Sequence, residues 1–159
     1  MMHTTTSPSY PLVASIETAA AMLRGNPGKR LINRSVERAL HFRKEVQRLK
    51  DEADGWFFDI WQPEEIDEAE CWPVSPGESW HGFRDADADH MFLDPVKVTI
   101  LTPGMDEQGT MSDEGIPAAL VAKFLDERGV VVEKTGPYNL LFLFSIGIDK
   151  PVRWAYCAD

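Results

Sequence analysis

The sequence predicts a protein of the α/β (α+β) class, in which helices pack on a small mixed or antiparallel sheet. Residues 96–100 alternate between apolar and polar side chains, which is typical of a half-buried strand. Residues 117–129 are typical of a helix, because a proline stands at the favoured first position and a glycine at the end. Residues 130–133 and 140–146 are rich in apolar side chains and predict two further strands. The order strand, helix, strand, strand indicates a sheet that the helix covers on one face.

The N-terminal part is predicted to contain two helices, a turn and a strand. A helix is expected over residues 15–24, capped by its first serine, and residues 26–28 (Asn-Pro-Gly) are typical of a turn. A second helix is expected over residues 35–50, and the aromatic residues 56–61 predict a strand. Residues 62–90, rich in proline, glycine and acids, predict a long connection. The apolar positions on the predicted buried faces are Val36, Leu40, Val46 and Leu49 in the second helix, and Leu120, Val121, Phe124 and Leu125 in the helix over residues 117–129.

The composition is that of an ordinary globular protein with an acidic surface. Of the 159 residues, 43% are hydrophobic, which is enough to build a core. No run of about 18 apolar residues occurs, and the N-terminus lacks the pattern of a secretory signal, so neither a membrane span nor export is expected. Cys71 and Cys157 are far apart and form no disulfide framework, which favours a cytoplasmic location. The net charge of −10 disfavours nucleic acid as a partner, and we interpret it as a source of solubility.

The usual motifs of metal sites and of several enzyme classes are missing from the sequence. Asp85, Asp87 and Asp89 resemble the opening of a calcium loop, but His90 and Val96 stand where that loop requires glycine and glutamate. A solvated acidic loop is the better interpretation. The four histidines lack the spacing of a zinc site, so no metal is expected. The motifs of serine hydrolases, P-loop NTPases and dinucleotide-binding enzymes do not occur.

Two segments contain residue types that suit a ligand. Residues 4–8 place four hydroxyl groups together ahead of a helix, and hydroxyls with free backbone N–H groups suit a phosphate. A polar N-terminal tail is the alternative interpretation. Residues 133–139 form a charged loop between two apolar strands, where the carboxylate of Glu133 could pair with a cationic substrate. A surface ion pair between Glu133 and Lys134 explains the same residues equally well.

Five long stretches carry a family resemblance. They are residues 3–8 (HTTTSP), 14–30 (ASIETAAAMLRGNPGKR), 55–63 (GWFFDIWQP), 90–104 (HMFLDPVKVTILTPG) and 129–150 (GVVVEKTGPYNLLFLFSIGIDK). Together they cover roughly residues 1–150. Over this length the chain resembles the prokaryotic ornithine/lysine/arginine decarboxylase family, and its pattern is closest to the lysine decarboxylase branch.

The resemblance implies a fragment of a pyridoxal 5′-phosphate enzyme with the fold of aspartate aminotransferase, assembled as dimers that stack into larger rings. It implies decarboxylation of a basic amino acid, with L-lysine converted to cadaverine and CO₂, and a role in acid stress. It places Thr5 and Ser7 in the segment that reaches the cofactor phosphate of the partner subunit. It also matches Glu133 with the acid that pairs with the distal charged group of the substrate. A carboxylate pairs with an ammonium or a guanidinium, so Glu133 alone does not separate lysine and ornithine from arginine.

The chain also departs from the family pattern. The family holds its cofactor through a lysine that follows a histidine, whereas none of the seven lysines in this sequence follows a histidine. The match ends at Pro151, and the last nine residues show no helical stripe. We therefore expect a truncated or frame-shifted reading frame that contains no catalytic residue and cannot decarboxylate by itself. The alternative is a non-catalytic fragment or pseudogene product that acts at most as a binding or assembly module.

The resemblance also implies a division of the chain. Residues 1–25 are expected to end the cofactor-binding subdomain, and residues 26–150 to form the smaller α/β subdomain. Residues 151–159 are expected to be an aberrant tail. A subdomain of this kind would expose surfaces that are normally buried in a dimer, which favours association.

Overall fold

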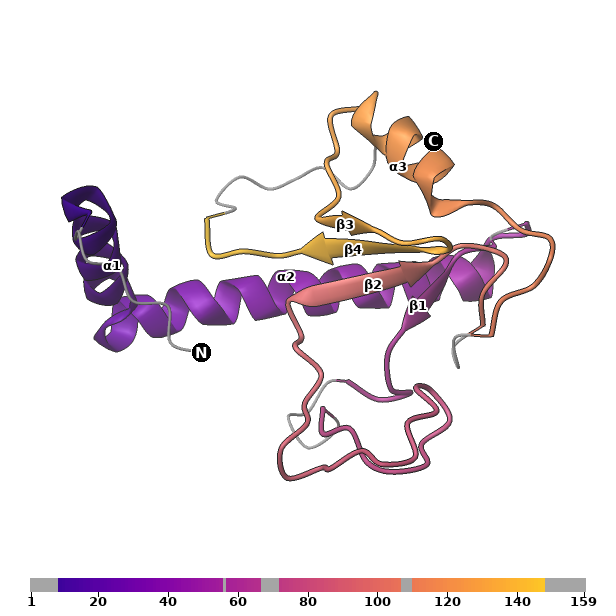
Figure 1. Cartoon of the computed structure of the whole chain (residues 1–159), viewed down its shortest axis with the longest axis horizontal. Helices are drawn as coiled ribbons and strands as arrows, with labels where there is room; N and C mark the ends of the chain where they lie inside the picture. The colour runs from indigo at the N-terminus through magenta and orange to yellow at the C-terminus, as the bar shows by residue number, and fades with distance from the viewer. Residues whose placement is uncertain (1–8, 56, 67–71, 107–109, 148–159) are drawn as a thin grey trace. The chain divides into compact units, whose positions relative to one another are not determined.

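The computed structural model describes residues 9–55, 57–66, 72–106 and 110–147 (Figure 1). The chain divides into two compact units, Met1–Arg34 and Ser35–Asp159. Thr5, Ser7 and the tail from Pro151 onward lie outside the described residues. In the part of the chain that is described, no helix is both long enough and apolar enough to cross a membrane.

The first unit contains helix α1 (Tyr10–Leu23) and the start of helix α2 (Gly25–Glu52). The predicted cap at residue 15 is wrong, because the helix starts at Tyr10 and the Ser15 hydroxyl bonds to the carbonyl of Leu12 at 2.8 Å. The predicted turn at residues 26–28 is also wrong. The break between the two helices lies at Arg24 and Gly25 instead, and the φ of Gly25, 66°, is one that glycine adopts readily. The proline that follows fits the first turn of α2, where its missing N–H has no helical partner to lose.

In the second unit, one face of α2 packs on the sheet. The buried positions are Ser35, Ala39, Arg43 and Val46, spaced as one helix face requires. The predicted stripe is therefore confirmed only at Val46, whereas Val36, Leu40 and Leu49 are partly buried. The sequence prediction counted apolar residues alone, and the true face includes an arginine and a serine. The apolar core between α2 and the sheet consists of Ala39, Val46, Ile60, Val98, Ile100 and Phe144. The partly buried side chains of Phe42, Phe58, Val96 and Phe142 pack against it.

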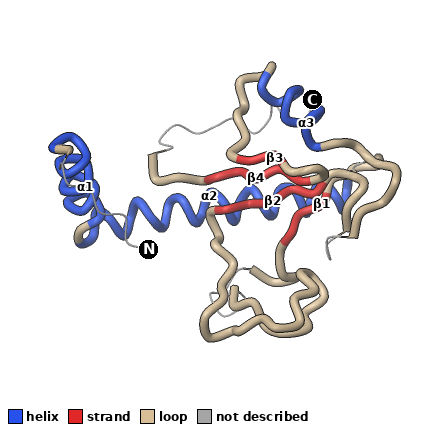
Figure 2. The backbone as a smooth tube through the Cα atoms, in the orientation of Figure 1, coloured by secondary structure: helices blue, strands red, loops and turns tan. Residues whose placement is uncertain are grey.

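The described strands form one sheet (Figure 2), and all of its strand pairs are antiparallel, which confirms the predicted α+β class. Its described strands are β1 (Asp59–Trp61), β2 (Lys97–Leu101), β3 (Lys134–Thr135) and β4 (Asn139–Leu143), in the order β1-β2-β4-β3. The predicted strand at residues 56–61 is shorter than expected, and the one predicted at residues 130–133 lies at residues 134–135 instead. Pairing with β4 decides this position, because β3 is an edge strand held only by that neighbour.

Helix α3 (Ala118–Asp126) confirms the helix predicted between two strands, and it packs beside β3 and β4. Its buried residues are Ala118 and Leu125, which join Leu140 of β4 in a second apolar cluster. Two residues predicted to be buried, Leu120 and Phe124, are exposed. The guanidinium carbon of Arg128 lies 3.5 Å from the centre of the Phe124 ring and covers part of it.

A buried arginine links α2 to the sheet. The residue Arg43 is 1% exposed, and its guanidinium donates to the backbone carbonyl of Lys97 at 2.9 Å and to the Gln62 side chain at 3.3 Å. Burial lowers the pKa of Arg43 to about 10, and the nearby charge of Asp94 opposes that shift. The side chain is therefore still a cation at neutral pH. Its burial requires these acceptors, since a buried charge without partners is strongly unfavourable.

Three chain segments meet at the end of β2. The backbone N–H of Thr102 donates to the carbonyl of Tyr138 at 2.9 Å, and the buried Thr102 hydroxyl donates to the carbonyl of Ile116 at 2.7 Å. The N–H of Ala118, at the start of α3, donates to the carbonyl of Pro137 at 2.9 Å. We call this meeting point, residues 102–104, 115–118 and 136–139, the three-segment junction. It fixes the β3–β4 turn to both β2 and α3.

We predict that Arg43→Ala lowers the free energy of unfolding by about 3 kcal/mol, because two hydrogen bonds from a charged donor and a buried stem are lost. Urea denaturation of the 159-residue chain measures this change. The matched control is Arg48→Ala on the same helix, where the side chain is exposed and pairs only with Glu45 and Glu52. An equal loss in both variants would show that the buried contacts of Arg43 contribute little.

We predict that Thr102→Val lowers the free energy of unfolding by about 2 kcal/mol, because the carbonyl of Ile116 loses its buried donor while the side-chain volume is kept. Thr102→Ser keeps the hydroxyl and loses a methyl group, so its loss should be smaller, about 1 kcal/mol. Thermal or urea unfolding of the two variants gives the order. The reverse order would mean that packing, and not the hydrogen bond, sets the role of Thr102.

Candidate functional site

Glu133, the predicted substrate-binding residue, stands immediately before β3. Its backbone N–H donates to the carbonyl of Leu141 at 2.8 Å, which continues the β3–β4 ladder by one hydrogen bond. The pairs Lys134–Leu141 and Thr135–Leu140 follow, and the turn closes with the N–H of Gly136 donating to the carbonyl of Asn139 at 2.9 Å. The backbone of Glu133 is thus held, while its side chain is exposed.

Glu133 has no ion-pair partner among the described residues, although Lys134 is its neighbour in the chain. The alternative interpretation of this loop, a surface pair between the two, therefore finds no support in the structure. Some of the other exposed acids on the same unit do have partners. For example, Asp126 lies 3.7 Å from the ammonium of Lys123. The Glu133 carboxylate is therefore free to pair with a cation from outside the described residues.

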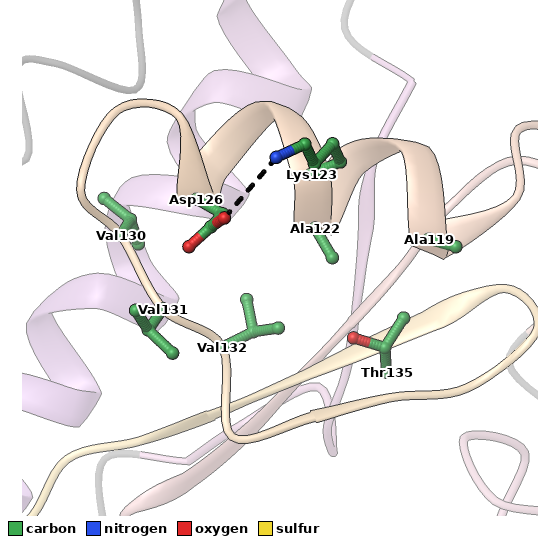
Figure 3. Close-up of a pocket in the computed structure, with 8 residues that line it drawn as sticks. All are labelled: Ala119, Ala122, Lys123, Asp126, Val130, Val131, Val132 and Thr135. Atoms are coloured by element: carbon green, nitrogen blue, oxygen red, sulfur yellow. Dashed lines mark ion pairs between the residues drawn. The ribbon is translucent and has the colours of Figure 1, made fainter.

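A hollow of about 390 Å³ lies between α3 and the segment that leads into β3 (Figure 3). Its walls are mainly apolar, and the Lys123–Asp126 ion pair lies at its upper side in this view. Glu133 is not part of its lining, although residues on both sides of it are. The hollow therefore offers apolar contact area and no free charge for a basic amino acid. The lining residues are Ala119, Ala122, Lys123, Asp126, Val130, Val131, Val132 and Thr135.

The described residues do not fit a covalent pyridoxal phosphate site. A lysine that forms a Schiff base needs a desolvated position with its pKa lowered. The described lysines are all exposed, and several are held in ion pairs with acids, such as Lys50 with Asp59 at 2.7 Å. Thr5 and Ser7, predicted to contact the cofactor phosphate, lie outside the described residues.

The acidic side chains of the loop, Asp85, Asp87 and Asp89, are exposed. The Asp87 carboxylate accepts from the backbone N–H of Asp89 at 3.0 Å, and it also lies 3.0 Å from the His90 ring nitrogen Nδ1. These contacts make a local turn. Among the described residues, no group of three or more His, Cys, Asp or Glu side chains is arranged to hold a metal ion.

One of the four histidines, His81, is buried and hydrogen-bonded, which the sequence analysis did not predict. The His81 side chain is buried, its Nδ1 accepts from the backbone N–H of Phe83 at 2.8 Å, and its Nε2 lies 3.0 Å from the carbonyl of Ser75. Trp80 packs against the ring edge-on, at 4.6 Å between centroids. Both ring nitrogens therefore have hydrogen-bond partners, and the histidine is part of the buried interior of the 72–93 loop.

The sequence analysis missed the contact between Gly104 and the ring of Tyr138, a residue in the turn of the Glu133 hairpin. A Cβ atom built on Gly104, which has a φ of 115°, would lie 2.5 Å from Cε1 of Tyr138. The aromatic ring therefore occupies the space that every other residue would fill at position 104. The signal in the sequence was the pair of short motifs Thr-Pro-Gly at residues 102–104 and Gly-Pro-Tyr at residues 136–138, whose contact with each other no local pattern reveals.

Comparisons with known proteins agree with the resemblance in the sequence. The family model for the major domain of Orn/Lys/Arg decarboxylases matches residues 1–152. The constitutive lysine decarboxylase of Escherichia coli K12 is 91% identical over 150 residues, which are 94% of this chain and 21% of that protein. The inducible lysine decarboxylase of the same organism is 71% identical over 150 residues, again 94% of this chain and 21% of that protein.

The solved structure of the E. coli constitutive lysine decarboxylase matches the fold with a TM-score of 0.77 at 90% identity, covering 93% of this chain and 21% of that one. The chain thus spans about a fifth of the length of the relatives that it matches. Since the family model covers nearly all of the chain, the chain belongs to the Orn/Lys/Arg decarboxylase family, as part of its major domain.

Proposed function

We propose that this chain serves as part of a pyridoxal-phosphate-dependent decarboxylase that converts L-lysine to cadaverine and CO₂. The observation that carries the proposal is the Glu133 carboxylate, which is exposed, is backbone-anchored and has no ion-pair partner among the described residues. Such a group can pair with the distal ammonium of a lysine substrate. The choice of lysine over arginine and ornithine rests on the two lysine decarboxylases at 91% and 71% identity.

The role proposed for Glu133 is binding and orientation. A carboxylate held on a hairpin meets the far end of the substrate while the reacting end is placed elsewhere, so its contribution is to position the substrate. The interaction is the same in the ground state and the transition state if the distal group does not move during the reaction. Its loss should then raise KM more than it lowers kcat.

The lysine that forms the Schiff base with the cofactor is proposed to lie outside this chain, because every described lysine is exposed. Thr5 and Ser7 are proposed to contact the cofactor phosphate, as hydroxyl groups suit an anion with several acceptor oxygens. We further propose that the protein is cytoplasmic, assembles as a homo-oligomer, and has neither nucleic acid nor a membrane as a partner, in line with its net charge of −10.

A second function, an assembly module without catalysis, is favoured by one observation. None of the residues of α1 is buried, and this helix exposes large apolar side chains, among them Tyr10, Leu12 and Ile16 at 80%, 65% and 68%. Apolar surface of this extent usually contacts another protein surface. Contact through α1 alone does not separate the two functions, because a segment of an oligomeric enzyme would also bury such a surface against another subunit.

The test of Glu133 uses a chimeric full-length enzyme, in which the matching segment of the E. coli constitutive lysine decarboxylase is replaced by the segment of this chain. Glu133→Gln removes the charge and keeps the shape, and we expect a loss of about 2 kcal/mol of substrate binding, seen as a KM for lysine that rises roughly 10- to 50-fold. Steady-state decarboxylation rates give KM and kcat separately.

The matched control is Glu127→Gln, which removes an exposed carboxylate from the C-terminal end of α3 and should leave KM within about twofold of the parent. An unchanged KM for Glu133→Gln would remove Glu133 from the binding site. Equal effects of the two substitutions would point to a general electrostatic change of the surface.

The isolated 159-residue chain, supplied with pyridoxal phosphate and lysine, is expected to release no cadaverine. The reason is that each described lysine is exposed and none has the desolvated environment that an aldehyde-binding lysine needs. Chromatographic assay of cadaverine, with the chimeric enzyme as the positive control, measures this. Turnover by the isolated chain above the rate of free cofactor would contradict the assignment of the covalent site to residues elsewhere.

A further inference from the structure

The turn between β3 and β4 is held from both sides by residues of the three-segment junction. On the β2 side, the carbonyl of Tyr138 accepts from Thr102, whose own side chain is 1% exposed. On the α3 side, the carbonyl of Pro137 accepts from Ala118, the first residue of the helix. The turn that closes the hairpin is therefore attached to the rest of the unit by its backbone.

The side chain of Tyr138 adds a third attachment. Its ring lies against the face of Gly104, where an added Cβ would come within 2.5 Å of Cε1 and 2.7 Å of Cδ1. Contact this close is available only because Gly104 lacks a side chain. The ring is thus seated on the loop that follows β2.

The register of the hairpin connects this seat to Glu133. Residues 134 and 135 pair with residues 141 and 140, and the N–H of Glu133 bonds to the carbonyl of Leu141. A strand shifted by one residue turns each side chain to the opposite face of the sheet. With only two paired residues, β3 holds its own register weakly. The direction of the Glu133 carboxylate therefore depends on where the turn is fixed.

We propose that Tyr138 is a positioning residue for Glu133: its ring, seated on Gly104, sets the register of the β3–β4 hairpin and so aims the carboxylate that binds the distal ammonium of the substrate. This inference rests on the proposed function of Glu133. Tyr138 does not touch the substrate in this account. Tyr138 acts through the turn, so removal of its ring weakens substrate binding only when the Glu133 carboxylate is present.

The experiment is a double-mutant cycle in the chimeric full-length enzyme, with KM for lysine, kcat and the melting temperature measured for each variant. Tyr138→Ala removes the ring, and KM should rise about tenfold while kcat stays within about twofold. Tyr138→Phe keeps the ring and should restore KM to near the parent value. In the Glu133→Gln background, Tyr138→Ala should raise KM by less than about twofold more, because the group that it positions is gone.

A second pair of variants reaches the same contact from the opposite side. Gly104→Ala places a methyl group where the Tyr138 ring lies and should raise KM in the same way as Tyr138→Ala. Gly55→Ala is the matched control, because Gly55 also has a positive φ, 85°, but nothing lies within 4 Å of an added Cβ. It carries the same kind of backbone strain and should lower the melting temperature without changing KM.

Each outcome decides between distinct accounts. If Glu133→Gln leaves KM unchanged, the proposed function of Glu133 fails and the inference fails with it. If Glu133→Gln raises KM but Tyr138→Ala lowers only the melting temperature, Glu133 keeps its role and Tyr138 is merely structural. If Tyr138→Ala raises KM equally in both backgrounds, Tyr138 acts independently of Glu133 and the inference is overturned. Should Tyr138→Ala not fold, Tyr138→Leu and Gly104→Ala carry the same comparison.

Discussion

The central strand β4 lies between β2 and β3, and its antiparallel pairing with β2 joins segments that are far apart in the sequence. The register runs from Lys97 opposite Leu143 to Leu101 opposite Asn139. This ladder places the loop after β2 beside the β3–β4 turn, so that the junction can form. It also presents Val98 and Ile100 to α2 in the main core. The β3–β4 hairpin that holds Glu133 is thus positioned by the pairing of β4 with β2.

Buried polar groups give this small unit its definite geometry. The Arg43 guanidinium and the Thr102 hydroxyl are both almost fully buried, and each donates to a backbone carbonyl of another element. Apolar packing alone tolerates small slides between elements, whereas a buried donor must meet its acceptor or lose free energy. The two residues therefore fix α2 against β2, and β2 against the segment before α3. In contrast, the ion pairs on the surface are exposed and contribute little.

The family membership and the geometry supply different parts of the functional account. Similarity over nearly the whole chain shows the family, and the chain accounts for about a fifth of each relative's length. Geometry adds that one acidic side chain on a backbone-anchored hairpin has no ion-pair partner in the described part of the chain. A free carboxylate on a held backbone is suited to a cationic ligand, because little conformational freedom is lost on binding. The exposed apolar side chains of helix α1 support the proposed contact with another protein surface.

The sequence by itself determined the α+β class, the existence of β2, α3 and β4, and the candidate Glu133, since each rests on local periodicity or on a long resemblance. It placed the corner at residues 26–28 and the third strand at residues 130–133, because proline, glycine and valine are strong local signals. The tertiary structure moved the corner to Gly25 and the strand to residues 134–135, where pairing with β4 outweighs propensity. Only the tertiary structure could place Arg43 in the core or seat Tyr138 on Gly104, because both depend on partners distant in the chain.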